Sequence, residues 1–526
     1  MTKGNFAKLE ALVELSERDR ERMIERGTSP DEAARWIEMF RRGAKPTRLE
    51  RACVVGDGIL RVEREEIERA IEASDEATAK GRVTKFVPAS GAATRMFKKL
   101  VAALEDPNLA DIGGARKAAE AGDPNAEAAR QVFEEIERFA FHYDLANAAR
   151  HKGEDLDETL KRGDLKRVLS LLLTEEGLDY QNKPKALVKF HGSGEEARTP
   201  LEEHLLEAAE IAKDAEGRAR VHFTASPEHV EEMRALAERA ARRFDAEFSV
   251  EFSTQKPSTD TIAADMNDRP FRDENGDILF RPGGHGALLE NLNDLGADVV
   301  MIKNIDNVQP ERTARRTVEY KKLLAGLLVD LQKRAFDYLL KIETGKLVGE
   351  ELAEAVRFAR ERLNVETAAN LEARSDDEKR AWLRDRLDRP MRVAGMVRNE
   401  GQPGGGPFWA RAGAEVSPQI VETAQMDLDD PEQKRILDSA THFNPVDIAC
   451  GLRNYRGESF DLLDYRDDDA AFITKKSKGG ADVKALELPG LWNGGMAKWL
   501  TVFVELPIET FTPVKEVVDL LAPEHQ

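Results

Sequence analysis

Cysteine is nearly absent from the chain, which has only Cys53 and Cys450 in 526 residues. Two cysteines cannot build the disulfide framework that holds many small secreted domains together. They also cannot supply the four ligands of an all-cysteine zinc site. We therefore expect a protein of a reducing compartment.

Long hydrophobic runs are missing as well. No stretch reaches the ~18 consecutive apolar residues that a membrane-spanning helix needs. The first ten residues, Met1 to Glu10, lack the apolar segment of a secretion signal. These absences favour a cytoplasmic protein without a membrane partner.

Basic residues are outnumbered, because 79 Lys and Arg face 99 Asp and Glu and give a net charge of −20. Proteins that bind DNA nonspecifically need a basic surface to contact the phosphates. A nucleic acid polymer is therefore not expected as a partner. A local basic pocket for a single nucleotide remains compatible with this charge.

Several catalytic patterns are also missing. The chain has no Gly-x-x-x-x-Gly-Lys-Ser/Thr run, which argues against a P-loop kinase. Ser90 and Ser193 lie near glycines but lack the nucleophile elbow of a hydrolase. His442 has no cysteine or carboxylate at metal-ligand spacing, so no zinc site is predicted there.

The length implies more than one domain. The patterns of apolar and charged residues divide the chain into a helical N-terminal segment, a core with a helical insertion, a second helical segment and a strand-rich part that completes the core. The corresponding ranges are 1–80, 81–310 with the insertion at 101–180, 311–388 and 389–526.

Strand-like and helix-like patterns alternate in the second half of the predicted core. Extended patterns cover 184–190, 220–224, 248–252 and 299–302, and helical patterns cover 199–213, 228–243 and 286–295. Alternation of this kind predicts a mostly parallel sheet covered by helices. We therefore predict an α/β fold.

The most informative motif is a glycine-rich turn followed by an apolar strand. The turn contains Gly283, Gly284, His285 and Gly286, and the strand ends at Asn304 and Asp306. Glycines allow close approach of the backbone to a ligand, and open α/β sheets bind nucleotides beyond the carboxyl ends of their strands. A plain tight turn before a buried strand, with polar residues closing it, explains the same pattern without a ligand.

A second motif is the loop 90–96, which follows a short apolar segment and opens a predicted helix. It contains Ser90, Gly91, Ala92, Thr94 and Arg95. A Pro184-Lys185 pair stands after the helical insertion.

Together these motifs resemble those of nucleotide-sugar pyrophosphorylases. That family has a glycine-rich loop ending in Gly-x-Gly-Thr-Arg and a later Pro-Lys pair. The turn 282–286 and the sequence Asn304-Ile305-Asp306-Asn307 resemble its uridylyltransferase branch, and Gln255 stands where that branch has a Gln before a Pro-containing loop. More loosely, 419–422 and 443–445 resemble its sugar-side elements. The whole chain also resembles an uncharacterised bacterial family described only as a domain of unknown function.

The resemblance implies a Rossmann-like three-layer nucleotidyltransferase core. It implies that UTP, or another nucleoside triphosphate, reacts with a sugar 1-phosphate to give a nucleotide sugar and pyrophosphate. Arg95 would bind the leaving phosphates, Lys185 the reacting ones, and Asp306 would hold Mg²⁺. The remaining nucleotide-binding residues would be Ser90, Gly91, Ala92, Thr94, Gln255, Gly283, Gly284, His285, Gly286 and Asn304.

Two departures from the family pattern keep other functions open. Ser90 and Ala93 stand where the family has glycine, and the insertion at 101–180 is unusual for it. A glycosyltransferase that uses a finished nucleotide sugar is one alternative. A noncatalytic protein that binds nucleotide sugars on the same fold is another. The sequence identifies neither the sugar nor the oligomeric state.

Overall fold

The structure, a computed structural model, describes residues 15–366, 370–401, 404–412, 415–478 and 480–526. Residues 1–14 of the predicted N-terminal segment therefore lie outside it. The chain forms two compact units, each built from separate stretches. Unit 1 takes the chain up to Ala77, Gln255–Met301 and Leu323–Pro507, and unit 2 takes Thr78–Thr254, Ile302–Lys322 and Ile508–Gln526. Three of the five boundaries fall within α4 (Arg64–Ala79), β9 (Val299–Lys303) and α14 (Glu311–Glu343), and the other two, at 254/255 and 507/508, lie outside any α-helix or strand.

Unit 2 contains three parallel strands in the order β4–β5–β6. They are β4 (Val83–Pro88), β5 (Arg218–Thr224) and β6 (Glu247–Ser253), with α11 (Pro200–Ile211) before β5 and α12 (Val230–Ala241) after it. Apolar residues of both helices pack against Val87 of β4 and against Val221 and Phe223 of β5. The alternation of strands and helices predicted for this stretch is present, and the architecture is mixed α/β.

Residues 101–180, predicted to be helical, lie within a set of helices between β4 and α11. These are α5 (Thr94–Glu105), α6 (Ile112–Glu120), α7 (Pro124–Glu134), α8 (His142–His151), α9 (Leu156–Lys161) and α10 (Leu165–Leu173). Four of them begin at aspartates whose side chains accept main-chain N–H groups, at Asp111, Asp123, Asp155 and Asp164. The caps explain why a charge-rich stretch divides into short helices.

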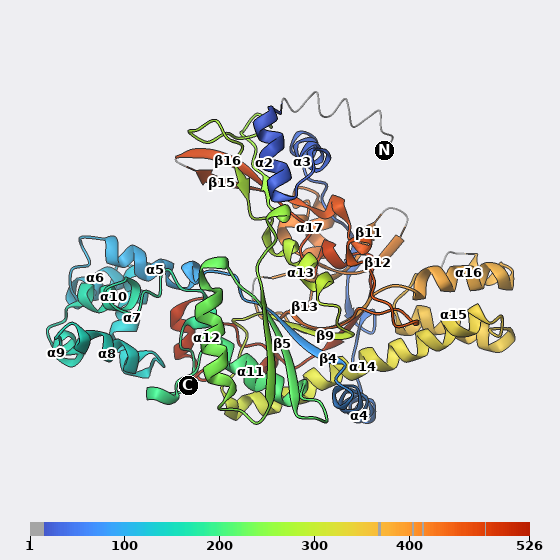
Figure 1. Ribbon diagram of the computed structural model, residues 1–526, viewed down its shortest axis with the longest axis horizontal. Coiled ribbons are helices and arrows are strands. Elements are labelled where there is room, and N and C mark those ends of the chain that lie inside the picture. Colours follow the sequence, from blue (N-terminus) through green and yellow to red (C-terminus); the bar gives the residue numbers. More distant parts are fainter. Residues whose placement is uncertain (1–14, 367–369, 402–403, 413–414, 479) are drawn as a thin grey trace. The chain divides into compact units, whose positions relative to one another are not determined.

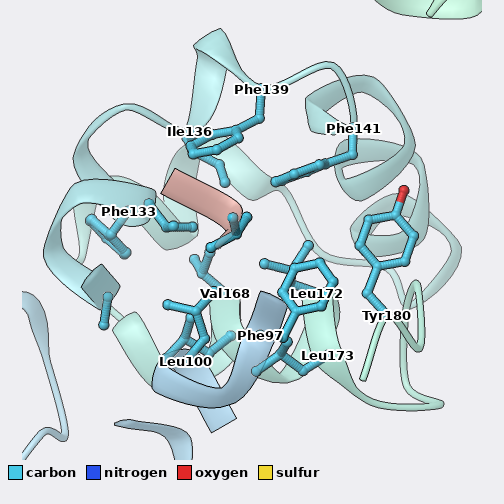
Figure 2. Packing of buried hydrophobic residues seen from close by; sticks show 14 of the residues in the cluster. Phe97, Leu100, Phe133, Ile136, Phe139, Phe141, Val168, Leu172, Leu173 and Tyr180 are labelled. Carbon is cyan, nitrogen blue, oxygen red and sulfur yellow. The ribbon is translucent and has the colours of Figure 1, made fainter. Parts of the chain in front are cut away.

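The apolar faces of these helices meet in one buried core, shown in Figure 2. The Phe139 and Phe141 rings stack at 4.8 Å, and Tyr180 meets Phe141 edge to face at 5.7 Å. Val308 and Val514 belong to the same core. The core therefore ties α5 to two distant stretches of the chain, those around residues 308 and 514.

Unit 1 contains a five-strand arrangement in the order β2–β3–β17–β10–β14, in which β3, β17 and β10 are parallel and β14 is antiparallel to β10. A separate antiparallel sheet has the order β1–β11–β12, the hairpins are β7–β8 and β15–β16, and β13 pairs with β10. The strands are β1 (Arg48–Ala52), β2 (Val54–Val55), β3 (Gly58–Leu60), β7 (Thr261–Ile262), β8 (Phe280–Arg281), β10 (Met391–Arg398), β11 (Gly406–Ala412), β12 (Glu415–Val421), β13 (His442–Phe443), β14 (Asp447–Gly451), β15 (Phe472–Lys478), β16 (Ala481–Glu487) and β17 (Leu500–Glu505).

The helices that lie wholly in unit 1 include α15 and α16, which lie side by side (Figure 1). Among the described residues, the full set of α-helices that lie wholly in unit 1 is α2 (Glu17–Arg26), α3 (Pro30–Arg42), α13 (Leu288–Asp294), α15 (Gly349–Arg362), α16 (Asp376–Leu387) and α17 (Pro431–Asp438). Within the described ranges, no helix combines the length and apolar character needed to cross a bilayer.

Two local expectations are wrong. The predicted helical segment 1–80 contains β1, whose charged sequence Arg-Leu-Glu-Arg-Ala has no strand pattern of its own. It becomes a strand because it pairs with β11, more than 350 residues later, and long-range pairing outweighs local propensity. Residues 184–190, predicted to be extended, instead make a short 3₁₀ turn at Lys185–Leu187.

Candidate functional site

The loop after β4 leads directly into helix α5. Gly91, Ala92, Thr94 and Arg95 are exposed, and the residue before the helix, Ala93, offers no side-chain cap. The first N–H groups of a helix carry a partial positive charge and bind anions well when no side chain satisfies them. Arg95 makes no ion pair with any described residue, so its exposed guanidinium is available to a ligand.

The loop lies against the Pro-Lys pair predicted to act with it. Ala92 pairs with Pro184 in an isolated β-bridge, and the Ala93 N–H donates to the Lys183 carbonyl oxygen at 3.0 Å. Two motifs separated by the whole helical insertion thus meet in unit 2.

Lys185 forms an ion pair with Asp306, which follows the end of β9. Lys185 Nζ lies 2.8 Å from Asp306 Oδ2 and donates to the Val514 carbonyl oxygen at 2.7 Å. Lys515 Nζ lies 3.6 Å from the same carboxylate oxygen. The Val514 N–H donates to the Asp306 carbonyl oxygen at 3.0 Å, so the C-terminal stretch is fixed beside the carboxylate.

The charges of this cluster set the state of Asp306. Burial raises the pKa of the Asp306 carboxyl, but the positive charges of Lys185 and Lys515 outweigh burial and hold it below its ordinary value. Asp306 is therefore ionised at neutral pH. One carboxylate between two ammonium groups leaves a local excess of positive charge, which suits phosphate.

Lys515 is a candidate residue that the sequence interpretation missed. No local pattern distinguishes it from other lysines, because its partner Asp306 lies about two hundred residues earlier in the chain. Only the fold shows that it lies within reach of that carboxylate.

A metal site at Asp306 would rely on few protein ligands. Across the part of the chain that the structure describes, no three His, Cys, Asp or Glu side chains gather as metal ligands. Mg²⁺ commonly uses one or two carboxylates and takes its other ligands from water and phosphates. A single ionised carboxylate fits that mode, in which phosphate and water supply the other ligands, and does not fit an all-protein metal cage.

The glycine-rich turn lies in unit 1 and is packed too tightly for other residues. A Cβ on Gly283 would lie 2.5 Å from the Thr259 carbonyl oxygen, and one on Gly286 would lie 2.3 Å from that of Pro489. Gly284 has a φ of +74°. Packing alone therefore requires these glycines, as the ligand-free interpretation of the motif proposed.

His285 lies in this turn as a neutral ring. Its centroid is 4.3 Å from that of Trp492, and its Nδ1 accepts the Leu491 N–H at 3.2 Å. The proton must then sit on Nε2, which lies 3.7 Å from Glu422 Oε1. Burial lowers the pKa of His285 to about 4, so the ring is a hydrogen-bond donor rather than a base at neutral pH.

Glu422 belongs to the stretch that resembles the sugar-side elements. Burial and then the charge of Glu487 raise its pKa above the ordinary value. A carboxyl group with a raised pKa can accept hydrogen bonds from hydroxyl groups and, when it is protonated, donate one to them.

Comparison with known proteins assigns the chain to a protein family. The sequence model of the family described as "Domain of unknown function (DUF4301)" matches residues 16–526. The chain belongs to this family. That result confirms the resemblance of the whole chain to a domain-of-unknown-function family. Comparison with curated proteins finds no match.

Among solved structures the chain is similar to UDP-sugar pyrophosphorylases. The enzyme for UDP-N-acetylglucosamine from Trypanosoma brucei, in complex with an inhibitor, has 14% identity and a TM-score of 0.46 over 99% of this chain and 82% of that one. UDP-glucose pyrophosphorylase from Leishmania major, in complex with UDP-glucose, has 12% identity and a TM-score of 0.42 over 96% and 77%.

The remaining predicted residues divide between the two units. Gln255, in unit 1, donates from Nε2 to Asp260 Oδ1 at 3.0 Å, and its amide oxygen accepts no hydrogen bond from the described residues. Asn304, in unit 2, is half-buried, and its carbonyl oxygen lies 3.2 Å from His204 Nε2. Unit 2 thus holds the predicted phosphate residues, and unit 1 holds Gln255 and the glycine turn.

Proposed function

We propose that this chain transfers a nucleotidyl group from a nucleoside triphosphate, UTP favoured, to a sugar 1-phosphate. The observation that carries the proposal is the cluster of Lys185, Asp306 and Lys515 in unit 2, which the Pro184 bridge links to the uncapped start of α5. A glycosyltransferase that uses a finished nucleotide sugar has no triphosphate to bind, so the exposed Arg95 favours the pyrophosphorylase reaction.

The proposed chemistry is an in-line displacement at the α-phosphorus. An oxygen of the sugar phosphate forms the new P–O bond, the bond to the β-phosphate oxygen breaks, and pyrophosphate leaves with that electron pair. The protein has to hold two polyanions together and spread the developing charge. Asp306 would hold Mg²⁺, which would supply positive charge to neutralise part of that developing charge.

Each residue of the cluster has a specific task in this scheme. Arg95 and the first N–H groups of α5 would hold the leaving phosphates, since guanidinium binds phosphate in a bidentate way. Lys185 and Lys515 would neutralise the reacting phosphates as point charges. Lys185 also keeps Asp306 in place through the ion pair already described.

Gln255 and the turn 283–286 are the residues that we propose for recognition of the base. Gln255 offers a free amide oxygen as an acceptor, and an amide side chain pairs well with the edge of a pyrimidine. The main chain at the turn 283–286 would come close to the ring. The preference for UTP rests on the resemblance of these residues to the uridylyltransferase branch.

The direct test is pyrophosphate release from each of UTP, ATP, GTP, CTP and dTTP with glucose 1-phosphate or N-acetylglucosamine 1-phosphate, with and without Mg²⁺. We expect Mg²⁺-dependent release with UTP, and a rise in melting temperature with UTP because ligands stabilise the state that binds them. Stabilisation by UDP-sugars but not by any triphosphate would contradict the proposal and favour the glycosyltransferase or noncatalytic alternative.

The substitution Gly91→Ala, in the loop before α5, tests ligand binding without disturbing the fold. A Cβ at Gly91 would meet no atom within 4 Å, and its φ is not positive, so the melting temperature should stay unchanged. If phosphate approaches the Gly91 main chain, the added methyl group should raise the KM for UTP about tenfold or more. Gly113→Ala on α6 is the matched control, because its Cβ would meet only a side-chain oxygen of Asp111 at 3.2 Å. Equal KM values for both variants would remove Gly91 from the site.

A further inference from the structure

A separate cavity of about 600 Å³ lies entirely within unit 1. Its walls come from the end of α15, from α16, from the start of β12 and from the stretch that enters β17. Glu415 at the start of β12 lines it, whereas Glu422 follows the other end of that strand. At ~3.3 Å per residue, roughly 20 Å of strand separate the two. The cavity is therefore distinct from the His285 and Glu422 surroundings.

The charged residues of its wall are mainly basic. Glu415 and Asp385 each pair with both Arg386 and Arg389, so two carboxylates balance these two arginines. Lys498 Nζ and Arg374 Nη2 instead contact only neutral acceptors in the described structure, the Asp464 carbonyl oxygen at 3.1 Å and Asn370 Oδ1 at 3.3 Å. Glu366 also lines the cavity, so these two cations leave an excess of one positive charge at the wall, which favours an anionic ligand.

A fully buried arginine stands directly behind the wall. Arg392 is 0% exposed and donates from Nε to Thr501 Oγ1 at 2.9 Å, and Thr501 lines the cavity. Its other described acceptors, among them Gln419 Oε1 at 3.3 Å, are also neutral, and it forms no ion pair with a described carboxylate. Burial lowers the pKa of Arg392 to about 10, which still leaves it charged at neutral pH. A buried charge without a counter-ion attracts an anion strongly, because the protein interior screens it poorly.

The same wall carries an unsatisfied donor and an apolar surface. Trp499 is 3% exposed, and its Nε1–H finds no acceptor among the described residues. Buried indole N–H groups normally have a partner, so this one calls for water or a ligand. Trp382, Leu363 and Pro418 supply apolar lining.

We propose that this cavity is a binding site for an organic anion with a flat apolar body. A phosphate or carboxylate group would lie near Arg374 and Lys498, in the field of Arg392. The apolar body would lie against Trp382 and Trp499. Binding of this anion does not depend on the nucleotide or the sugar phosphate of the proposed reaction.

The test uses 1-naphthyl phosphate as a probe, titrated into the full chain by isothermal calorimetry. Its matched ligands are 1-naphthol, which lacks the charge, and inorganic phosphate, which lacks the ring. We expect 1-naphthyl phosphate to bind at least tenfold more tightly than either. Arg374→Ala and Lys498→Ala should each weaken it about tenfold, the loss of about 1.4 kcal/mol.

Three variants locate the binding. Lys475→Ala removes an exposed lysine of the same unit outside the cavity, and Arg95→Ala removes the proposed nucleotide arginine; both should leave naphthyl phosphate affinity unchanged. Trp499→Phe keeps an aromatic ring but removes the N–H, and should weaken binding without lowering the melting temperature greatly. Absence of binding, equal binding of 1-naphthol, or full affinity in an Arg374→Ala/Lys498→Ala double variant would each overturn the proposal.

Discussion

Asp306→Asn should lower kcat by about 10³-fold, because it removes the negative charge that would hold Mg²⁺ while keeping the size of the side chain. The measurement is pyrophosphate release over a range of Mg²⁺ concentrations with saturating UTP and sugar phosphate. Asp245→Asn is a matched control, since Asp245 is an exposed aspartate of the same unit whose pair with Lys213 is at the surface. It should keep full activity.

The same substitution should also lower stability, because the Lys185 side chain is only 12% exposed and its ammonium group loses its counter-ion. Breaking a buried pair costs about 3 kcal/mol, so kcat should be compared at a temperature where both proteins stay folded. The folded pKa of Asp306 is depressed. Its contribution to stability is therefore present above the unfolded value of ~3.9 and is lost as pH falls through the folded pKa. The difference in unfolding free energy between wild type and variant should shrink toward low pH.

Two results would contradict these expectations. Full activity in Asp306→Asn would remove the carboxylate from the metal site. A stability difference that does not change between pH 7 and pH 3 would show that the ion pair with Lys185 is not what stabilises this region.

The fold could be predicted from the sequence where a helix or strand has a clear local pattern of apolar residues. The strands β5 and β6 and the helices α11 and α12 have clear apolar periodicity, and each lies close to its expected place. Strand β1 has no such pattern, because its conformation comes from pairing with β11 far along the chain. Sequence periodicity cannot identify a strand that forms only because a distant strand pairs with it.

The residues of the candidate site could likewise be predicted only where they belong to a local sequence motif. The motifs around Arg95, Lys185 and Asp306 were visible because glycines, prolines and strand-end carboxylates form recognisable runs. Lys515 was not, since a lysine beside a distant carboxylate leaves no local trace. For Gly283 and Gly286 the sequence allowed both a structural and a ligand-binding role, and only the nearby main-chain oxygens show that packing alone requires glycine there.

Lys185→Met and Lys515→Met should separate the structural from the electrostatic role of the cluster, because both lysines face the same oxygen of Asp306. The Lys185 side chain is only 12% exposed and its partner Asp306 is buried, so its loss should cost about 3 kcal/mol of unfolding free energy. The Lys515 side chain is 54% exposed, and exposed ion pairs contribute at most about 1 kcal/mol, so Lys515→Met should unfold almost like wild type.

Activity should fall in both variants, since each removes a positive charge from the reacting phosphates. For Lys515→Met we expect kcat to fall about 10²-fold at nearly unchanged stability, measured by pyrophosphate release and by urea unfolding on the same preparation. A normal kcat in Lys515→Met would place Lys515 outside the reaction and confine its charge to the surface. An unchanged unfolding free energy in Lys185→Met would mean that Lys515 alone can balance the buried carboxylate, and that the contact of Lys185 with the Val514 carbonyl adds little.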